Sequence, residues 1–164
     1  MRALAEKGEL RRVGRGLFAI TNAWEDDLYI LQRKYARGIY SHETALYLLG
    51  YSDRTPARYT MTFPKGYNAP SIKQENVIVK RVLPKNYSWG VVEVKSPSGS
   101  PLLIYDLERS ICDVLRGGVV DVQVVGDAMK RYVASEEANI HKLTQFAERL
   151  RVKPKVMRYL EVLL

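Results

Sequence analysis

The chain has 164 residues, 46% of them hydrophobic and 27% charged, a composition that predicts one globular unit with a buried core and excludes a disordered chain. Its 26 Lys and Arg against 18 Asp and Glu give a formal charge of +8. This charge favours an acidic partner such as nucleic acid or an acidic protein, and a basic surface that serves solubility is the alternative.

Two further exclusions concern location and redox chemistry. No apolar run approaches the roughly 18 residues of a membrane-spanning helix, and no signal-peptide core follows Met1. The single cysteine, Cys112, excludes an internal disulfide, and its apolar surroundings in the sequence predict a buried, inert thiol. We therefore expect a cytoplasmic protein with no membrane partner.

The first 20 residues predict the end of a helix and then a basic hairpin. Strands are expected at 10–13 and 17–20, joined by a Gly-Arg-Gly turn at 14–16. Such a turn can approach a phosphate backbone, although a basic edge that resists aggregation would show the same charges. The candidates for contacts with DNA phosphates are Arg11, Arg12 and Arg15.

The next segment predicts a helix over 24–37, whose acidic start and basic end suit the helix dipole. A short strand is expected to follow, and then a helix that is N-capped by Ser41 and ends at Gly50 in a left-handed conformation. Residues 59–63 alternate between apolar and polar and predict a strand.

Residues 67–76 have the composition of a surface loop, after which the period-two pattern continues. Further strands are predicted at 77–83, 90–95 and 101–105. With 59–63 they make a small mixed or antiparallel sheet of about four strands, and many connections are short enough to be antiparallel.

The last third changes to a helical period. Helices are predicted at 106–116, 121–134, 139–150 and 153–164, with Pro154 in the first turn of the last one. The fold class is therefore α+β, with an N-terminal winged hairpin, a small sheet and a C-terminal helical bundle.

The last two predicted helices carry an excess of basic residues, which could bind an acidic protein or DNA or could form a solvated face. The candidates for a working surface are Arg151, Lys153 and Lys155.

The sequence offers little for catalysis, and we assign no catalytic residue, metal ligand or cofactor. His42 begins a zinc-protease signature that fails because position 46 is leucine. A Gly-Ser pair at 99–100 followed by Asp106 and Glu108 faintly resembles nucleotidyltransferases, which hold Mg²⁺ with two carboxylates. The preferred interpretation is that Asp106 caps a helix whose first turn contains Glu108.

Several short blocks follow one another in a fixed order. They are GRGLF at 14–18, WED at 24–26, GIYSHETALY at 38–47, SDRTP at 52–56, YTMTFP at 59–64, YDLERSICD at 105–113 and LRVK at 150–153. Together these blocks resemble the AbiEi-type antitoxins of bacterial type IV toxin–antitoxin systems, which act in abortive infection. The resemblance extends along nearly the whole chain.

The resemblance implies an antitoxin that antagonises a nucleotidyltransferase-like toxin without a stable complex and, where its winged helix is complete, represses its own operon. It divides the chain into a wing-like remnant of a DNA-binding domain, 1–23, and an antitoxin body, 24–164, with the sheet at 38–105 and the helices at 106–164.

Members of the family usually carry a helix-turn-helix before the wing, and here only about eight residues precede Leu10. We therefore expect binding to the chain's own promoter DNA to be weak or lost if the N-terminus is truncated. Two alternatives remain open: a divalent-metal nucleotidyl- or phosphotransferase that uses Asp106 and Glu108, and a basic protein-interaction module.

Overall fold

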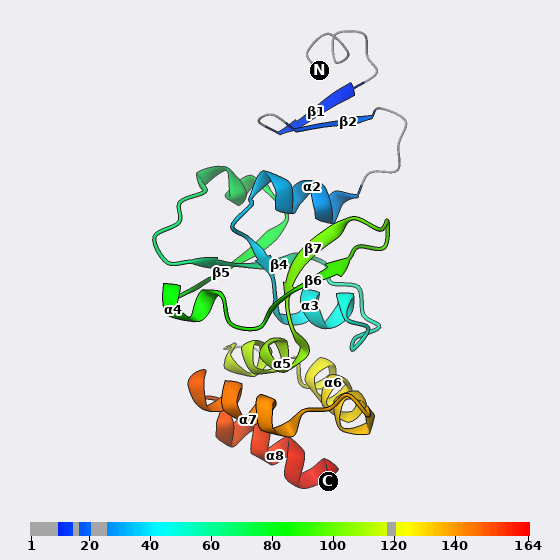
Figure 1. The fold of residues 1–164 in the computed structure, drawn as a ribbon, viewed down its shortest axis with the longest axis vertical. Helices are drawn as coiled ribbons and strands as arrows, with labels where there is room; N and C mark the ends of the chain where they lie inside the picture. Colours follow the sequence, from blue (N-terminus) through cyan, green and yellow to red (C-terminus); the bar gives the residue numbers. More distant parts are fainter. Residues whose placement is uncertain (1–9, 15–16, 21–25, 118–120) are drawn as a thin grey trace.

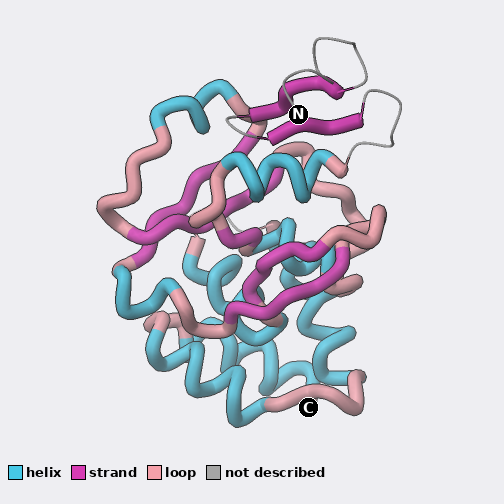
Figure 2. The backbone as a smooth tube through the Cα atoms, turned by 45° about the horizontal axis from the view of Figure 1, so that its top comes forward, coloured by secondary structure: helices cyan, strands magenta, loops and turns pink. Residues whose placement is uncertain are grey.

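The structure is a computed structural model that describes residues 10–14, 17–20, 26–117 and 121–164, with side chains from Asp26 onward. The fold is α+β, as predicted. A mixed sheet occupies the middle of the molecule, one helix covers it on the side of the N-terminal hairpin, and most of the other helices gather at the C-terminal end (Figure 1; Figure 2).

The hairpin consists of β1 (Leu10–Gly14) and β2 (Leu17–Ile20), which pair in antiparallel fashion with Arg12 opposite Phe18. The register shifts between Arg12 and Gly14, which is the signature of a bulge near the turn. Both predicted strands are confirmed.

Five strands in the described part of the chain form the mixed sheet, in the order β5-β4-β3-β7-β6. They are β3 (Ile39–Tyr40), β4 (Tyr59–Pro64), β5 (Val77–Val82), β6 (Val91–Lys95) and β7 (Pro101–Tyr105). The short strand predicted before α3 (His42–Leu48) is confirmed as the two-residue β3, but the expected count of about four did not include it in the sheet. This strand lies in the centre of the sheet, antiparallel to β4 and parallel to β7.

The connection from β4 to β5 also differs from the expectation of short antiparallel links, because these two strands are parallel. A parallel pair needs a crossover, and the crossover here contains the 3₁₀-helix η1 (Pro70–Gln74) in the predicted loop. Ile72 of η1 is buried in the sheet core, so this segment is more than a surface loop. A short helix that the sequence analysis did not predict, α4 (Pro84–Tyr87), follows β5.

Helix α2 (Asp27–Lys34) is shorter than predicted and lies against β7 through one glutamine. The Gln32 side chain donates to the Leu103 carbonyl at 2.7 Å and accepts from the Leu103 N–H at 2.8 Å. β3 is too short to pair along all of β7, and Gln32 satisfies backbone groups of β7 that would otherwise lack a partner.

Helix α3 (His42–Leu48) lies between the two cores of the molecule. Ala45 packs into the sheet core, and the next residue, Leu46, packs into the helical core. The helix ends as predicted with Gly50 at φ 79°, where the N–H of Tyr51 bonds to the carbonyl of Leu46 at 2.8 Å.

Ser41 is the N-cap residue of α3, as predicted, but its side chain makes no capping hydrogen bond in the described structure. Its hydroxyl instead accepts a hydrogen bond from Thr62 on β4 at 2.8 Å, so this buried side chain ties α3 to the sheet.

The sheet and the helical bundle meet at a buried arginine. Arg109 on α5 (Leu107–Arg116) is fully buried, and its Nε donates to Asp113 Oδ2 at 2.9 Å while its Nη1 donates to the Asn86 carbonyl at 2.9 Å. Its guanidinium lies 4.3 Å from the centroid of the Tyr105 ring. Burial raises the pKa of Asp113, and the adjacent guanidinium opposes this rise. The contacts fix α5 against the end of the sheet, because removal of either charge would leave the other buried and unpaired.

The four predicted C-terminal helices are confirmed within a residue at each end. After α5 come α6 (Val122–Ala134), α7 (Ile140–Arg149) and α8 (Lys153–Leu163). Their core contains Cys112, which is fully buried as predicted, and burial raises the pKa of its thiol. None of the described helices is long and apolar enough to cross a membrane.

Candidate functional site

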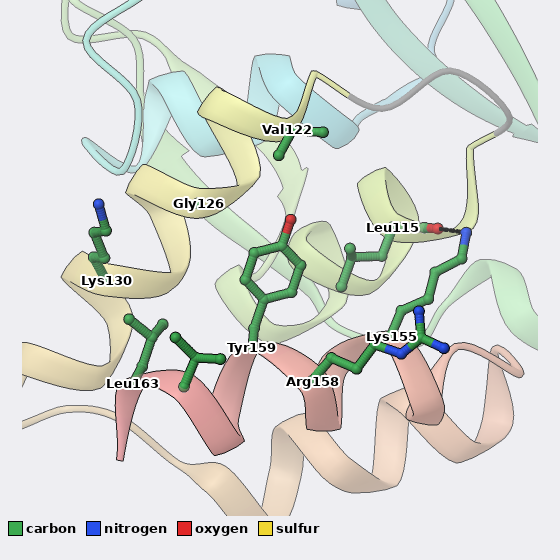
Figure 3. A pocket seen from close by; sticks show the side chains of 9 residues that line it. Leu115, Val122, Gly126, Lys130, Lys155, Arg158, Tyr159 and Leu163 are labelled. Atoms are coloured by element: carbon green, nitrogen blue, oxygen red, sulfur yellow. Dashed lines mark hydrogen bonds between the residues drawn. The ribbon is translucent and has the colours of Figure 1, made fainter.

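The C-terminal bundle carries an open apolar groove of about 540 Å³. It lies between the end of α5, one side of α6 and one side of α8 (Figure 3). The lining residues are Leu115 from α5, then Val122, Gly126 and Lys130 from α6, and Lys155, Arg158, Tyr159, Val162 and Leu163 from α8.

A second cavity, of about 460 Å³, lies between α6 and the segment that follows α3, and it is lined mainly by polar residues. Its two arginines are already engaged within the chain. Arg131 pairs with Asp53, and Arg54 pairs with Asp121 at 2.7 Å. The groove is the stronger candidate for binding because its lining is mainly apolar and because its cations form no ion pair within the described residues.

The groove side of α6 follows from helical periodicity. Val122, Gly126 and Lys130 are spaced four residues apart and therefore share one side of the helix. The other side is buried in the bundle through Val124, Val125, Ala128, Met129 and Tyr132. Asp121 begins the helix by accepting from the N–H groups of Gln123 and Val124.

The direction of α8 is set by the turn that precedes it. Arg151 has φ 60°, its N–H bonds to the Glu148 carbonyl at 3.0 Å, and the N–H of Val152 bonds to the Ala147 carbonyl at 2.8 Å. This pattern of bonds is a Schellman motif, with arginine at the position that usually holds glycine. Pro154 then lies in the first turn of α8, as predicted.

One stripe of α8 is buried and the next faces the groove. Val156 and Leu160 are in the core, whereas Lys155, Arg158 and Tyr159 line the groove, followed one turn later by Val162 and Leu163. In Figure 3 the Tyr159 ring extends between α8 and α6. At the apolar edges, Val122 is 70% exposed and Val162 is 84% exposed, which is unusual for valine without a partner.

Gly126 forms part of the floor of the groove. Glycine in a helix interior costs about 1 kcal/mol relative to alanine. A Cβ added at Gly126 would meet no atom within 4 Å, so no neighbour in the described structure requires glycine at this position. The missing side chain instead leaves the backbone of α6 open to close approach from outside.

The charges on the rim are all positive. Lys155 donates from Nζ to the Leu115 carbonyl at 2.6 Å, at the end of α5 where the helix dipole is negative. Lys130 and Arg158 are exposed and form no ion pair with any residue in the described ranges. Figure 3 shows Lys130 at one end of the groove and the other two cations at the opposite end. No acidic residue lines the groove among the residues that the structure describes.

The three residues predicted as a working surface are not brought together. Lys155 lines the groove. Lys153 pairs with Glu148 at 2.5 Å, and Arg151 lies exposed in the turn before α8, and neither lines the groove. The structure instead places Lys155 with Lys130 and Arg158.

The predicted phosphate contacts lie in the hairpin. Arg11 and Arg12 belong to β1, where the structure describes the backbone alone. Arg15 lies outside the described residues.

The two carboxylates of the enzyme alternative are held by a lysine. Asp106 caps α5 by accepting from the Arg109 N–H at 2.9 Å, as predicted. Lys142 Nζ lies 2.9 Å from Asp106 Oδ2 and 2.9 Å from Glu108 Oε2. The ammonium group thus occupies the place between the carboxylates that a divalent cation would need, and no group of three or more potential metal ligands occurs in the described ranges.

His42 behaves as a residue at a helix start that bonds to its surroundings. Its Nδ1 lies 2.9 Å from Ser41 Oγ, and its backbone has φ 54°. Burial lowers the pKa of its imidazole to about 3, so the ring is neutral at physiological pH.

Sequence reasoning missed the groove residues on α6. Gly126 offered a signal, since it lies inside the helix predicted at 121–134 with no cap or turn to explain it. The apolar end of α8, which runs to the exposed Val162 and Leu164, offered another.

Comparison with known proteins yields a structural relative only. No protein-family model and no curated protein sequence matches the chain. The fold is similar to the crystal structure of the RV2827C protein from Mycobacterium tuberculosis, with a TM-score of 0.63 and 18% sequence identity over 99% of this chain and 67% of that one. At this identity the likeness concerns the fold alone.

Proposed function

We propose that the chain is an antitoxin of a type IV abortive-infection toxin–antitoxin system, which antagonises a nucleotidyltransferase-like toxin through the surface of its C-terminal bundle. The observation that carries the proposal is the cation-rimmed apolar groove, a feature that suits binding to an acidic protein surface better than it suits chemistry. The resemblance of the sequence blocks to AbiEi-type antitoxins supports the same function. The antagonism is functional and needs no stable heterodimer.

The proposal treats the chain as a cytoplasmic binding protein and not as an enzyme. Support comes from Lys142, which neutralises the two carboxylates of the phosphotransferase alternative. Calorimetry with Mg²⁺ and ATP tests this point. Heat of binding that disappears in Asp106→Asn would favour the enzyme, and no heat in either protein fits the proposal.

Antitoxin activity is tested by growth rescue. Cells that express the cognate nucleotidyltransferase-like toxin required by the proposal should grow only when the chain is co-expressed. The triple variant Arg151→Glu, Lys153→Glu, Lys155→Glu should lose rescue while it keeps the helical circular dichroism of the parent. The variant removes the Lys153–Glu148 pair and the Lys155 hydrogen bond to the Leu115 carbonyl. Both contacts lie outside the bundle core, so the fold should survive their loss, and the circular dichroism checks this.

The matched control reverses three exposed lysines away from the C-terminal helices, namely Lys73, Lys85 and Lys95, and changes the net charge equally. It should rescue growth like the parent. Full rescue by the C-terminal triple variant would refute the assignment of the surface, and absence of rescue by the parent chain would refute the function.

DNA binding is proposed through the basic hairpin, with Arg11, Arg12 and Arg15 as contacts to phosphates. Contacts of this kind give weak, sequence-tolerant binding whose affinity falls steeply with salt. Titration of the chain's own promoter DNA and an unrelated duplex at two salt concentrations measures it. The variant Arg12→Ala, Arg15→Ala should lower both the affinity and the salt slope, and unchanged values would refute the assignment.

A further inference from the structure

We propose that the groove between α6 and α8 is a docking site for one amphipathic helix of a partner protein, with an apolar stripe in the middle and acidic residues toward both ends. The site is defined by Gly126 on its floor, Tyr159 on its wall and the three rim cations. The inference deepens the proposed function and rests on the same groove, since it names the kind of partner segment that the groove binds. The two can fail separately, because growth rescue tests the antitoxin function and peptide binding tests the groove.

The shape of the site fits a helix. The groove side of α6 extends from Val122 to Lys130, which at about 1.5 Å per residue corresponds to about 12 Å, or two turns of a docked helix. Gly126 lies at the midpoint of this stretch. Small residues at a helix–helix contact allow the two backbones to approach closely, which explains a glycine that no neighbour among the described residues requires.

The charges identify the chemistry of the occupant. Cations stand at both ends of the groove, Lys130 at one and Lys155 with Arg158 at the other (Figure 3). A helix with Glu or Asp toward both ends complements this arrangement, whereas a fatty acid carries its single carboxylate at one end only. A second copy of the chain is disfavoured because the same cationic surface would face itself.

The walls are already formed in the absence of a partner. Val124 and Val125 on α6 and Val156 and Leu160 on α8 are buried in the bundle core, directly beside the residues that line the groove. Lys155 is held by the Leu115 carbonyl. Binding therefore costs little ordering of the protein itself, which favours measurable affinity for a short helix.

The test uses the whole chain and fluorescence anisotropy with a synthetic three-turn amphipathic peptide that has a leucine and alanine stripe and glutamates toward both ends. The controls are a peptide of the same composition in scrambled order and a peptide with lysine in place of each glutamate. The patterned acidic peptide should bind, and the scrambled and lysine peptides should bind at least roughly tenfold more weakly. No binding of the patterned peptide at low ionic strength, or equal binding of the scrambled one, would overturn the proposal.

Two protein variants locate the binding. Gly126→Leu fills the floor of the groove and should weaken binding roughly tenfold or more. Lys130→Glu with Arg158→Glu leaves the core untouched and should weaken binding by about fivefold for each reversed charge. The salt dependence of binding should fall as well, because Lys155 is then the one rim cation left among the residues that line the groove. Lys73→Glu with Lys95→Glu is the matched control and should bind like the parent.

The remaining outcomes are equally decisive. Parental affinity in the Lys130, Arg158 double variant would overturn the proposal even if Gly126→Leu failed to fold. Displacement of the peptide by laurate at lower concentration than by unlabelled peptide would identify an anionic amphiphile as the occupant. Dimerisation of the free chain that the peptide reverses would identify a second copy.

Discussion

Replacement of Gly126 by alanine is expected to stabilise the protein, in contrast to most substitutions. Gly126 lies in the interior of α6, where alanine is favoured over glycine by about 1 kcal/mol, partly because alanine restricts the unfolded chain. Among the residues that the structure describes, the new Cβ meets no atom within 4 Å, so no clash with them offsets this gain. For a domain of this size, about 1 kcal/mol corresponds to a rise in Tm of about 2–4 °C.

Urea denaturation followed by far-ultraviolet circular dichroism measures this effect as a higher midpoint at an unchanged slope. Gly90→Ala is the matched control in the opposite direction. Gly90 has φ 72°, and a Cβ there would lie 3.0 Å from Arg109 Cβ and 3.0 Å from Asp106 Oδ1. This variant should lose more than about 1 kcal/mol. A loss of stability in Gly126→Ala similar to that of Gly90→Ala would refute the argument that the glycine serves something outside the fold.

Two further predictions concern titratable groups. Burial lowers the pKa of His42 to about 3 in the folded chain, against about 6.5 in the unfolded chain. Between these two values the unfolded chain binds a proton that the folded chain does not bind. The contribution of His42 to stability is therefore present above about pH 6.5 and is lost as the pH falls below it. Between pH 6.5 and 5 the loss in the free energy of unfolding should reach about 2 kcal/mol. His42→Asn, in which asparagine tolerates the positive φ, should remove this part of the acid sensitivity, as measured by urea denaturation at each pH. The same dependence of stability on pH in the variant and the parent would contradict the burial of a neutral ring. Lys142→Met should destabilise the fold by about 1 kcal/mol, and by more in low salt than in high salt, because Asp106 and Glu108 lose a shared and partly exposed cation. A variant as stable as the parent at both salt concentrations would show that Lys142 does not neutralise the pair.

The parts of the fold that the sequence predicts well are those in which a local pattern decides the structure. Each C-terminal helix buries one stripe of apolar residues, so its periodicity survives in the sequence, and Asp106 and Gly50 mark boundaries through their own chemistry. The place of β3 in the sheet is different. The short strand itself is predicted, but its central position depends on partners that are distant in the chain, and two residues carry no period that could indicate it.

The same distinction explains the misassigned details around the sheet. The parallel pairing of β4 and β5 depends on a crossover through η1, whose composition is that of a polar loop. Ser41 has the residue type of an N-cap, yet its hydroxyl accepts a hydrogen bond from Thr62, a residue that is distant in the chain. In both cases a contact between segments overrides a correct local preference.

The candidate site could be predicted only in part, because it is assembled from three helices. The sequence predicts Lys155 as a surface residue together with Arg151 and Lys153, which are its neighbours in the chain. Neither of these two lines the groove, and Lys130 lines it from a different helix, α6. The charge excess of a segment therefore indicates that a basic surface exists, but it does not indicate which residues form that surface.

The residues that line the groove contribute little to the stability of the fold, and this favours a role in binding. The core sides of α6 and α8 hold the bundle together. The opposite sides expose valine, carry a glycine at position 126 and hold three cations, with no acidic residue among the described residues that line the groove. Each of these features is neutral or unfavourable for the isolated chain. Where local choices oppose stability without a compensating contact in the chain, the compensation is expected from a bound partner. Gly126→Ala should thus improve the fold and, by raising the floor of the groove, reduce what the groove can bind.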